Sequence, residues 1–502
     1  MLEQPSYADT GGSASPQHEQ HRDHGRDLLK NLAAGGASSL LKAALQLAML
    51  PLMGRLLGPK EFGLYAMALP VVTFFTVVAD GGLGASLAKE RSHDTTVWNT
   101  AFYVMLALGV CVAGIVNLCG FGLAAVLHEP RLHALLALLS FNFIFIAVST
   151  LPSARLFQRN DLVSLSAVDT IATILGAGLA IGFALHGFGA MSLAVQSAAT
   201  FGGRALGLNA LAFELPGRKT SLKLLASHLH TGGVLVGTRL IDMFCRFAEN
   251  LLFSLAFGPA ALGSYTFANQ ACRFLVESAS NPVWAATYAQ SLKLVGAPFV
   301  ALQCNMARLM MLTVFPAACL VAAASPEVIP FLLGEKWHHA GHFVQILVCS
   351  YALAAAATIG GAALLATSHN RLFLFTSTLL VVGRVVAVAI GHWTGPLEAT
   401  TGVALAQVAY AVVMGVVLSR TYAITPAQIL AAIGTPAVAG LAGGLVCFVA
   451  LYLTPDSHAA TIASVALGGL AFLGTLSAID KDFTIAGLKR SIGKVRAREA
   501  EA

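Results

Sequence analysis

Long apolar runs, separated by short polar connections, recur from about residue 32 to residue 479 of this 502-residue chain. An α-helix needs about 20 mostly apolar residues to cross a bilayer, so one span with its loop takes roughly 30–35 residues. The sequence is 57% hydrophobic and only 11% charged, which is too little charge to coat a soluble protein of this length. A helix satisfies its own backbone hydrogen bonds in lipid. The runs therefore predict an all-α polytopic membrane protein with about 14 transmembrane helices.

The connections between these runs leave no room for a sizeable soluble domain. Residues 1–27 are polar and rich in Gly, Ser, Gln and His, and we expect them to form a disordered cytoplasmic tail. The basic segment 481–502 is expected to form a second cytoplasmic tail. The predicted spans cover residues 32–54, 62–87, 97–126, 132–153, 162–185, 188–212, 229–256, 263–290, 299–323, 341–366, 372–392, 398–420, 428–452 and 459–479.

Lysines and arginines in the loops predict the orientation, because cytoplasmic loops carry an excess of them. With a cytoplasmic N-terminus, the loops on that side hold Lys89, Arg91, Arg155, Arg159, Arg218, Lys219, Lys223, Lys293, Arg371 and Arg420. The periplasmic loops then hold only Arg55, Lys60, Arg131 and Lys336. We therefore predict a multi-pass protein of the bacterial inner membrane with both termini in the cytoplasm. The net charge of +6 follows from this topology, so no nucleic-acid partner is needed to explain it.

Two segments 200 residues apart indicate an internal repeat. Residues 57–65 read LGPKEFGLY and residues 257–265 read FGPAALGSY, so Gly, Pro, Gly and Tyr coincide without a gap. In each copy the first Gly can end one helix and Pro can open the next, and the Tyr is expected near the membrane interface. The turns at 156–162 and 366–372 correspond as well.

The repeat predicts an N-terminal six-helix lobe over 28–215, a C-terminal six-helix lobe over 222–422, and two additional transmembrane helices over 428–480. Because six spans is an even number, both copies have the same orientation in the membrane. In transporters such repeats commonly flank a central binding site.

Charged residues inside the predicted spans need a physical reason, because each costs roughly 2.5–3.5 kcal/mol at the bilayer centre. Arg239, Asp242, Arg246 and Glu249 of span seven fall within an arc of about 80° at 100° per residue. That face must point into the bundle or a wet cavity. The remaining charges within the membrane are Lys42, Asp169, Arg204, Arg273, Glu277, Arg308 and Arg384.

These seven bases and four acids suit an anionic cargo, because guanidinium groups bind phosphate oxygens in a bidentate manner. The candidate cargo-binding residues are Lys42, Arg239, Asp242, Arg246, Glu249, Arg273, Glu277 and Arg384. The alternative is that Asp242 with Arg246, and Arg273 with Glu277, form ion pairs that hold helices together. Lys42, and whichever of Arg239 and Arg246 stays unpaired, are then the better candidates for cargo contact. Arg204 and Arg308 are expected to snorkel toward the cytoplasm.

Nothing in the sequence points to an enzyme, a metal or a bound cofactor. The eight cysteines form no CxxC pair, no P-loop is present, and no loop is long enough for a catalytic domain. His338, His339 and His342 cluster without a carboxylate or cysteine to complete a metal site. A coupling ion, H⁺ or Na⁺, stays open, and Asp242, Glu249 or Glu277 could titrate in that role.

The segment RLLGPKEFGLY at 55–65 resembles the signature that follows the first helix of Wzx-type polysaccharide flippases, which belong to the multidrug/oligosaccharidyl-lipid/polysaccharide (MOP) exporter superfamily. The motifs DGGL at 80–83 and LLGEKW at 332–337 are similar to patterns of the same family, and the resemblance covers about residues 28–422. It implies two lobes that alternate between inward-open and outward-open states. The implied cargo is a polyprenyl-diphosphate-linked oligosaccharide repeat unit, moved to the periplasmic leaflet for exopolysaccharide or lipopolysaccharide biosynthesis.

The implied partners are this lipid-linked substrate, the membrane lipid, and the polysaccharide polymerase and export machinery. Two alternatives in the same superfamily stay open. An ion-coupled drug or metabolite antiporter is expected to carry a surplus of acids instead of bases. A peptidoglycan-precursor flippase shares the anionic diphosphate and is harder to separate on charge alone.

Overall fold

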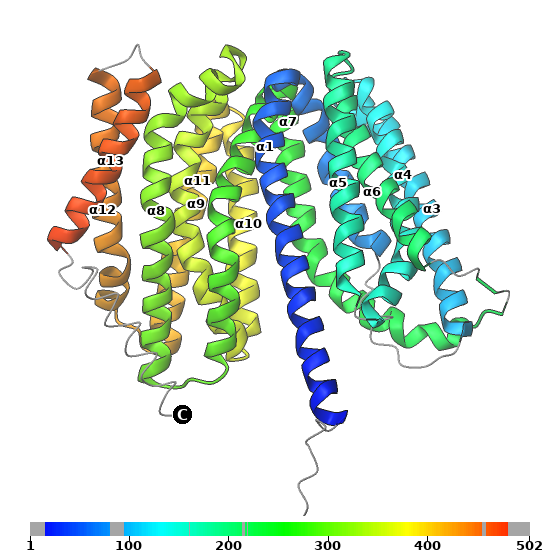
Figure 1. Ribbon diagram of the computed structural model, residues 1–502. Helices are drawn as coiled ribbons and strands as arrows, with labels where there is room; N and C mark the ends of the chain where they lie inside the picture. Colours follow the sequence, from blue (N-terminus) through cyan, green and yellow to red (C-terminus); the bar gives the residue numbers. More distant parts are fainter. Residues whose placement is uncertain are drawn as a thin grey trace, which may run out of the picture.

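The computed structural model describes residues 16–80, 95–159, 161–212, 216–217, 219–453 and 458–479. For residues 16–37, 40, 80, 222–242, 245 and 458–459 it describes the backbone alone. In this part of the chain every regular element is a helix (Figure 1). Eleven of these helices are long and apolar enough to cross a membrane, which confirms an all-α polytopic membrane protein.

The helices follow one another with short connections. Their bounds are α1 (Pro16–Asp80), α3 (Thr95–Val126), α4 (Arg131–Gln158), α5 (Leu162–Leu185), α6 (Met191–Ala212), α7 (Leu222–Ser291), α8 (Ala297–Leu333), the 3-10 helix η1 (Glu335–Trp337), α9 (His338–Ala366), α10 (Asn370–Gly391), α11 (Pro396–Tyr422), α12 (Pro426–Leu453) and α13 (His458–Ile479). Helices α3–α6 pack around α1, helices α8–α11 pack around α7, and α12 and α13 pack against α8 (Figure 1).

The longest helices, α1 and α7, are each broken at the repeated Gly-Pro step. Gly58 has φ 74° and ψ 168°, and Gly258 has φ 78° and ψ 178°. Positive φ favours glycine, and the following proline needs no N–H partner as it opens the second half. Across the second break the rings of Phe253 and Tyr265 stack 4.1 Å apart, so α7 folds back on itself as a helical hairpin. The break predicted from the repeat is confirmed in both copies.

The two hairpins contact each other through matched glycines. A Cβ atom at Gly63 would lie 1.7 Å from the carbonyl oxygen of Pro259, and one at Gly263 would lie 2.0 Å from that of Pro59. No side chain fits at either position. The contact joins α1 to α7 at one end of the molecule, at the top of Figure 1, which we call the hairpin end.

Trp337 covers this contact from the C-terminal half of the chain. Its side chain is fully buried, and its indole N–H donates to the carbonyl oxygen of Gly54 at 2.9 Å. Its ring lies 5.7 Å from that of Phe62 and 5.0 Å from that of Phe267. The motifs at 55–65 and 332–337, which are far apart in the sequence, therefore form one packed cluster.

The acidic residue of the first motif, Glu61, joins three helices. Arg131 at the start of α4 donates to both of its carboxylate oxygens, at 2.7 and 2.8 Å. The backbone N–H of Ala190, next to the start of α6, donates to the same carboxylate at 2.8 Å. These bonds tie the second half of α1 to α4 and α6, so this part of the motif serves the assembly of the helices.

Two expectations from the sequence differ from the structure. Helix α1 begins at Pro16, inside the segment 1–27 that we expected to be disordered, because adding residues to an existing helix needs no new nucleation. Tyr265 is fully buried and contacts Glu249, so it is not an interface residue. Residues 1–15, 81–94 and 480–502, with Gly81–Leu83 of the second motif and the C-terminal tail, lie outside the described residues.

Candidate functional site

A cavity of about 450 Å³ lies between the second half of α1 and both halves of α7, and α9 and α10 complete its wall. Its size is within the roughly 300–1,000 Å³ of small-molecule sites. Its lining is Leu69, Pro70, Thr73, Met243, Arg246, Glu249, Asn250, Thr266, Asn269, Gln270, Arg273, Tyr351 and Arg384. Four of the eight candidate residues, Arg246, Glu249, Arg273 and Arg384, therefore meet at one site. As described, the lining has three guanidinium groups and one carboxylate.

Glu249 and Arg384 form a buried ion pair in the wall of this cavity. The Nη2 atom of Arg384 lies 2.8 Å from Oε1 of Glu249. Only 15% of the Arg384 side chain and 6% of the Glu249 side chain are exposed. The Tyr265 hydroxyl donates to the same carboxylate oxygen. Burying a charge is costly unless it is paired and hydrogen-bonded, and this carboxylate meets both conditions.

A second set of hydrogen bonds orients the guanidinium group of Arg384. Its Nη1 donates to the Tyr351 hydroxyl at 3.1 Å, and that hydroxyl donates to Oδ1 of Asn269 at 2.8 Å. Nη2 also reaches Oδ1 of Asn269 at 3.3 Å. Among the described residues the buried Nε atom of Arg384 has no hydrogen-bond partner. The network thus holds a guanidinium at the cavity with its Nε donor unused.

Arg273 and Glu277 form the ion pair that their i, i+4 spacing predicts. The Nε atom of Arg273 lies 2.9 Å from Oε1 of Glu277, with 39% and 47% of the side chains exposed. Arg273 lines the cavity, and Glu277 lies one turn further along α7. The side chains of Arg239 and Asp242 lie outside the described residues, so the predicted pairing of Asp242 with Arg246 stays a prediction.

Lys42 lies outside this cavity, and our expectation that it is unpaired is wrong. Its Nζ atom is 3.9 Å from Oδ2 of Asp169 on α5, and Arg204 on α6 places Nε 3.1 Å from the other oxygen. Arg204 therefore pairs within the bundle instead of snorkelling. An unpaired base inside the membrane is unfavourable. The Asp169 carboxylate attracts both Lys42 and Arg204, and the low dielectric of the membrane interior strengthens this attraction. Ser38 supports the same helix pair through a 2.7 Å contact with Thr170.

The two charge clusters lie on matching helices of the repeat with opposite polarity. In the first copy the base, Lys42, is on the first helix and the acid, Asp169, is on the fifth. In the second copy the acid, Glu249, is on the first helix and the base, Arg384, is on the fifth. Sequence reasoning missed this relation and the roles of Tyr265 and Tyr351. The available signal was a tyrosine in the interior of each apolar span, which calls for a hydrogen-bond partner.

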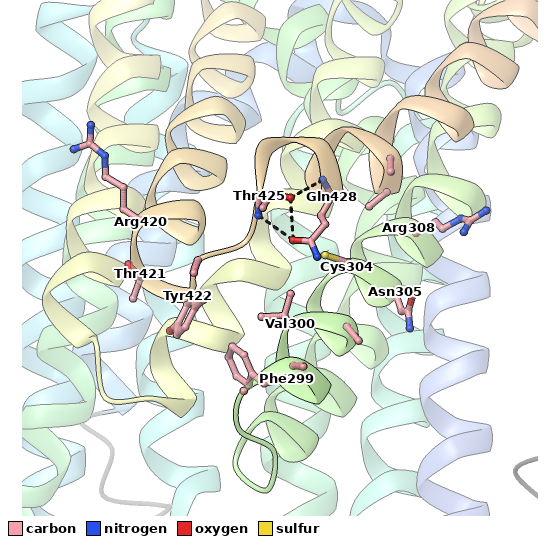
Figure 2. A pocket seen from close by; sticks show the side chains of 16 residues that line it. Phe299, Val300, Cys304, Asn305, Arg308, Arg420, Thr421, Tyr422, Thr425 and Gln428 are labelled. Carbon is pink, nitrogen blue, oxygen red and sulfur yellow. Dashed lines mark hydrogen bonds between the residues drawn. The ribbon is translucent and has the colours of Figure 1, made fainter.

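A larger pocket of about 830 Å³ lies between the ends of α8, α11 and α12 that are opposite the hairpin end. Figure 2 shows Arg308 and Arg420 on opposite sides of it, with their guanidinium groups turned away from each other. Gln428 on α12 accepts hydrogen bonds from the Thr425 backbone N–H at 2.9 Å and from its hydroxyl at 3.1 Å, as a helix cap. Because its charges do not converge, we take the 450 Å³ cavity as the candidate site.

Comparison with known proteins agrees with this architecture. The family described as "Polysaccharide biosynthesis protein" matches residues 52–342, more than half of the chain. The succinoglycan biosynthesis transport protein ExoT of Rhizobium meliloti (strain 1021) is 26% identical over 220 residues, which span 44% of this chain and 44% of that protein. The lipopolysaccharide biosynthesis protein WzxC of Escherichia coli (strain K12) is 21% identical over 399 residues, 77% of this chain and 80% of that one.

Solved structures share the fold at low sequence identity. The lipid II flippase MurJ, in an inward closed conformation, matches with a TM-score of 0.68 at 11% identity, over 89% of this chain and 99% of that one. An inward-facing multidrug resistance MATE transporter of the MOP superfamily matches with a TM-score of 0.58 at 14% identity, over 78% and 96%.

The helices define a multi-pass, all-α membrane protein with the fold of these solved structures. Within that class the chain belongs to the polysaccharide biosynthesis protein family, whose match covers both Gly-Pro breaks, the signature motif and most of the cavity. It is therefore a multi-pass membrane protein of polysaccharide biosynthesis.

Proposed function

We propose that this protein is a flippase for a polyprenyl-diphosphate-linked oligosaccharide repeat unit. It moves the unit from the cytoplasmic to the periplasmic leaflet of the bacterial inner membrane by alternating access. The product serves exopolysaccharide or lipopolysaccharide biosynthesis, and a polymerase and export machinery take it over. In this proposal each half of α1 and of α7 crosses once, so that twelve α-helices provide 14 spans, with two six-helix lobes, two additional helices and both termini in the cytoplasm.

The observation that carries the proposal is the cavity between the two repeats. Its described lining has the bases Arg246, Arg273 and Arg384 against the single carboxylate of Glu249, and Glu277, which pairs with Arg273, lies outside the lining. A diphosphate has about two negative charges, and arginines are the residues best suited to bind it. At about 450 Å³ the cavity suits the diphosphate with the sugar nearest to it, rather than a whole oligosaccharide. The polyprenyl tail stays in lipid, where its burial costs nothing.

The antiporter alternative requires the opposite charge balance, because a cationic drug is stabilised by a surplus of acids. A peptidoglycan-precursor flippase meets the same anionic requirement, so the identity of the trapped intermediate separates the two flippase classes.

We would delete the gene and extract polyprenyl-linked intermediates from spheroplasts. A complete repeat unit trapped in the cytoplasmic leaflet, with surface polymer lost, supports the proposal and reveals the sugar by mass. Normal polymer with no trapped intermediate favours the antiporter, to be followed by efflux assays.

A single substitution tests the cavity itself. We expect Arg246→Ala to abolish complementation of the deletion strain while the protein inserts at normal levels, because the diphosphate loses one of its guanidinium partners. The matched control is Arg371→Ala, which removes an exposed arginine at the start of α10. Wild-type transport by a well-expressed Arg246→Ala variant would contradict the assignment of the cavity.

A further inference from the structure

The second half of α7 has a continuous polar and aromatic stripe. At 100° per residue, seven side chains fall within an arc of about 80°. They are Thr266, Gln270, Arg273, Glu277, Asn281, Trp284 and Tyr288. The helix keeps helical φ and ψ from Pro259 to Ser291, since Gly258 is the residue where α7 departs from them. The seven residues therefore share one face.

This stripe leads out of the candidate cavity. Thr266, Gln270 and Arg273 are part of the cavity lining, and the remaining four residues continue along the same face toward the end of α7. Arg273 and Tyr288 are 15 residues apart, which corresponds to about 22 Å of helix at 1.5 Å per residue. Gln270, Glu277 and Asn281 are exposed and the other four residues are half-buried, so the face is partly accessible along its length. A ligand larger than the cavity can extend along it.

Trp284 and Tyr288 form a stacked aromatic pair on this face, which we call the platform. Their ring planes are parallel to within 2° and their ring centres are 5.6 Å apart. Among the described residues, the indole N–H of Trp284, the hydroxyl of Tyr288 and the carboxamide of Asn281 make no hydrogen bond. By contrast, Trp337 and Tyr265 are fully buried and each makes a hydrogen bond. The platform therefore presents open aromatic faces beside unused donors and acceptors.

This combination matches the surface of a sugar. A pyranose ring has an apolar C–H face, which packs on an aromatic ring, and a rim of hydroxyl groups, which bond to carboxylates and amides. Glu277 and Asn281 supply such groups one to two turns from the platform. The charge of Glu277 is balanced by Arg273, so this part of the stripe is close to neutral and suits a ligand with hydroxyl groups instead of phosphate.

Resting on the proposed function, we propose that this stripe of α7 is a carbohydrate-binding track for the distal sugars of the cargo. The diphosphate occupies the cavity at Arg246 and Arg384, and the oligosaccharide extends past Arg273 and Glu277. A distal pyranose packs on the outer face of the aromatic pair formed by Trp284 and Tyr288. The track would make these two aromatic residues determinants of specificity for the oligosaccharide.

The test measures binding of the free oligosaccharide released by mild acid from the lipid fraction of the deletion strain. The purified full-length protein is used in lipid nanodiscs. We expect Trp284→Leu to weaken binding about tenfold, because the flat ring is lost, and Trp284→Phe to stay within about threefold of wild type. In transport assays the half-saturating substrate concentration rises in Trp284→Leu while the maximal rate is kept. Tyr288→Leu behaves in the same way.

The matched control is Trp393→Leu, which removes a tryptophan that is 81% exposed beyond the end of α10. Unchanged oligosaccharide binding in both Trp284→Leu and Tyr288→Leu overturns the track. The track is also overturned if the variants lose activity only in proportion to their reduced membrane insertion. That result would identify Trp284 and Tyr288 as an anchor at the membrane interface. If the deletion strain traps no lipid-linked oligosaccharide, the proposed function fails and the track fails with it. A trapped intermediate with unaffected variants refutes the track alone.

Discussion

Arg384 places a guanidinium group inside the membrane with 15% of its side chain exposed, and Glu249 is its carboxylate partner. The two residues are 135 positions apart, and Tyr265, Tyr351 and Asn269 complete their hydrogen bonds. A pair of this kind contributes little to stability as a whole, because desolvation offsets the attraction. Removing one partner is costly, however, because the other charge is left buried.

Removing one partner of the pair costs more stability than removing both. Stability measurements can therefore separate a structural role of Arg384 from contact with the proposed cargo. We expect Arg384→Met to lower the free energy of unfolding by about 3–5 kcal/mol, because Glu249 is left unpaired. The double variant Glu249→Gln with Arg384→Met should recover most of that loss, since both groups are then neutral. Thermal unfolding of the purified protein measures both. A single variant as stable as wild type, or a double variant no more stable than the single, would refute the buried pair.

If Arg384 also contacts the diphosphate, the double variant recovers stability without recovering transport. Complementation of the deletion strain by a stable double variant would restrict Arg384 to holding α7 and α10 together. This comparison is informative because stability and transport are read separately.

Among the elements, the paired hairpins of α1 and α7 impose the tightest steric requirement. Each break brings a proline carbonyl against a glycine of the other copy, and Trp337 covers the contact. Interiors are packed as densely as organic crystals, so an added methyl group at such a contact must displace backbone. The alternating-access cycle that we propose has to open this end, which requires this contact to separate.

We therefore expect Gly63→Ala and Gly263→Ala to favour states in which the hairpin end is open. A cysteine introduced at Met53, which is 2% exposed near this end, should react faster with an aqueous maleimide in these backgrounds, and transport should fall. Gly114→Ala is the control, because a Cβ atom there meets nothing within 4 Å. Reactivity and transport equal to those of Gly114→Ala in both variants would refute a closing role for the contact.

For the whole molecule, the direction of transport depends on which end faces the cytoplasm. Lys293 precedes α8 and Lys336 follows it, so the two exposed lysines lie at opposite ends of one span. In a background without native cysteines, we expect a cysteine at Lys336 to react with a membrane-impermeant maleimide in intact spheroplasts. A cysteine at Lys293 should react only after permeabilisation, as the loop charges predict. The reverse pattern would invert the proposed direction of transport.

Features that depend on local chemistry could be predicted from the amino-acid sequence alone. Apolar length predicted the spans, since a helix in lipid must satisfy its own backbone. The Gly-Pro steps predicted both helix breaks, because positive φ and a missing N–H are properties of single residues. The pair of Arg273 and Glu277 followed from its i, i+4 spacing on one helix.

Contacts between residues on different helices became apparent only when the packing of the helices was known. Lys42 was expected to be unpaired and Arg204 to snorkel, yet both contact Asp169. Tyr265 was expected at the interface and instead bonds to Glu249, while Arg384 reaches the same carboxylate from α10. Such pairings depend on how each helix is rotated and how deeply it packs against its neighbours. Those two quantities are set by contacts across the whole bundle, so the periodicity of a single helix does not contain them.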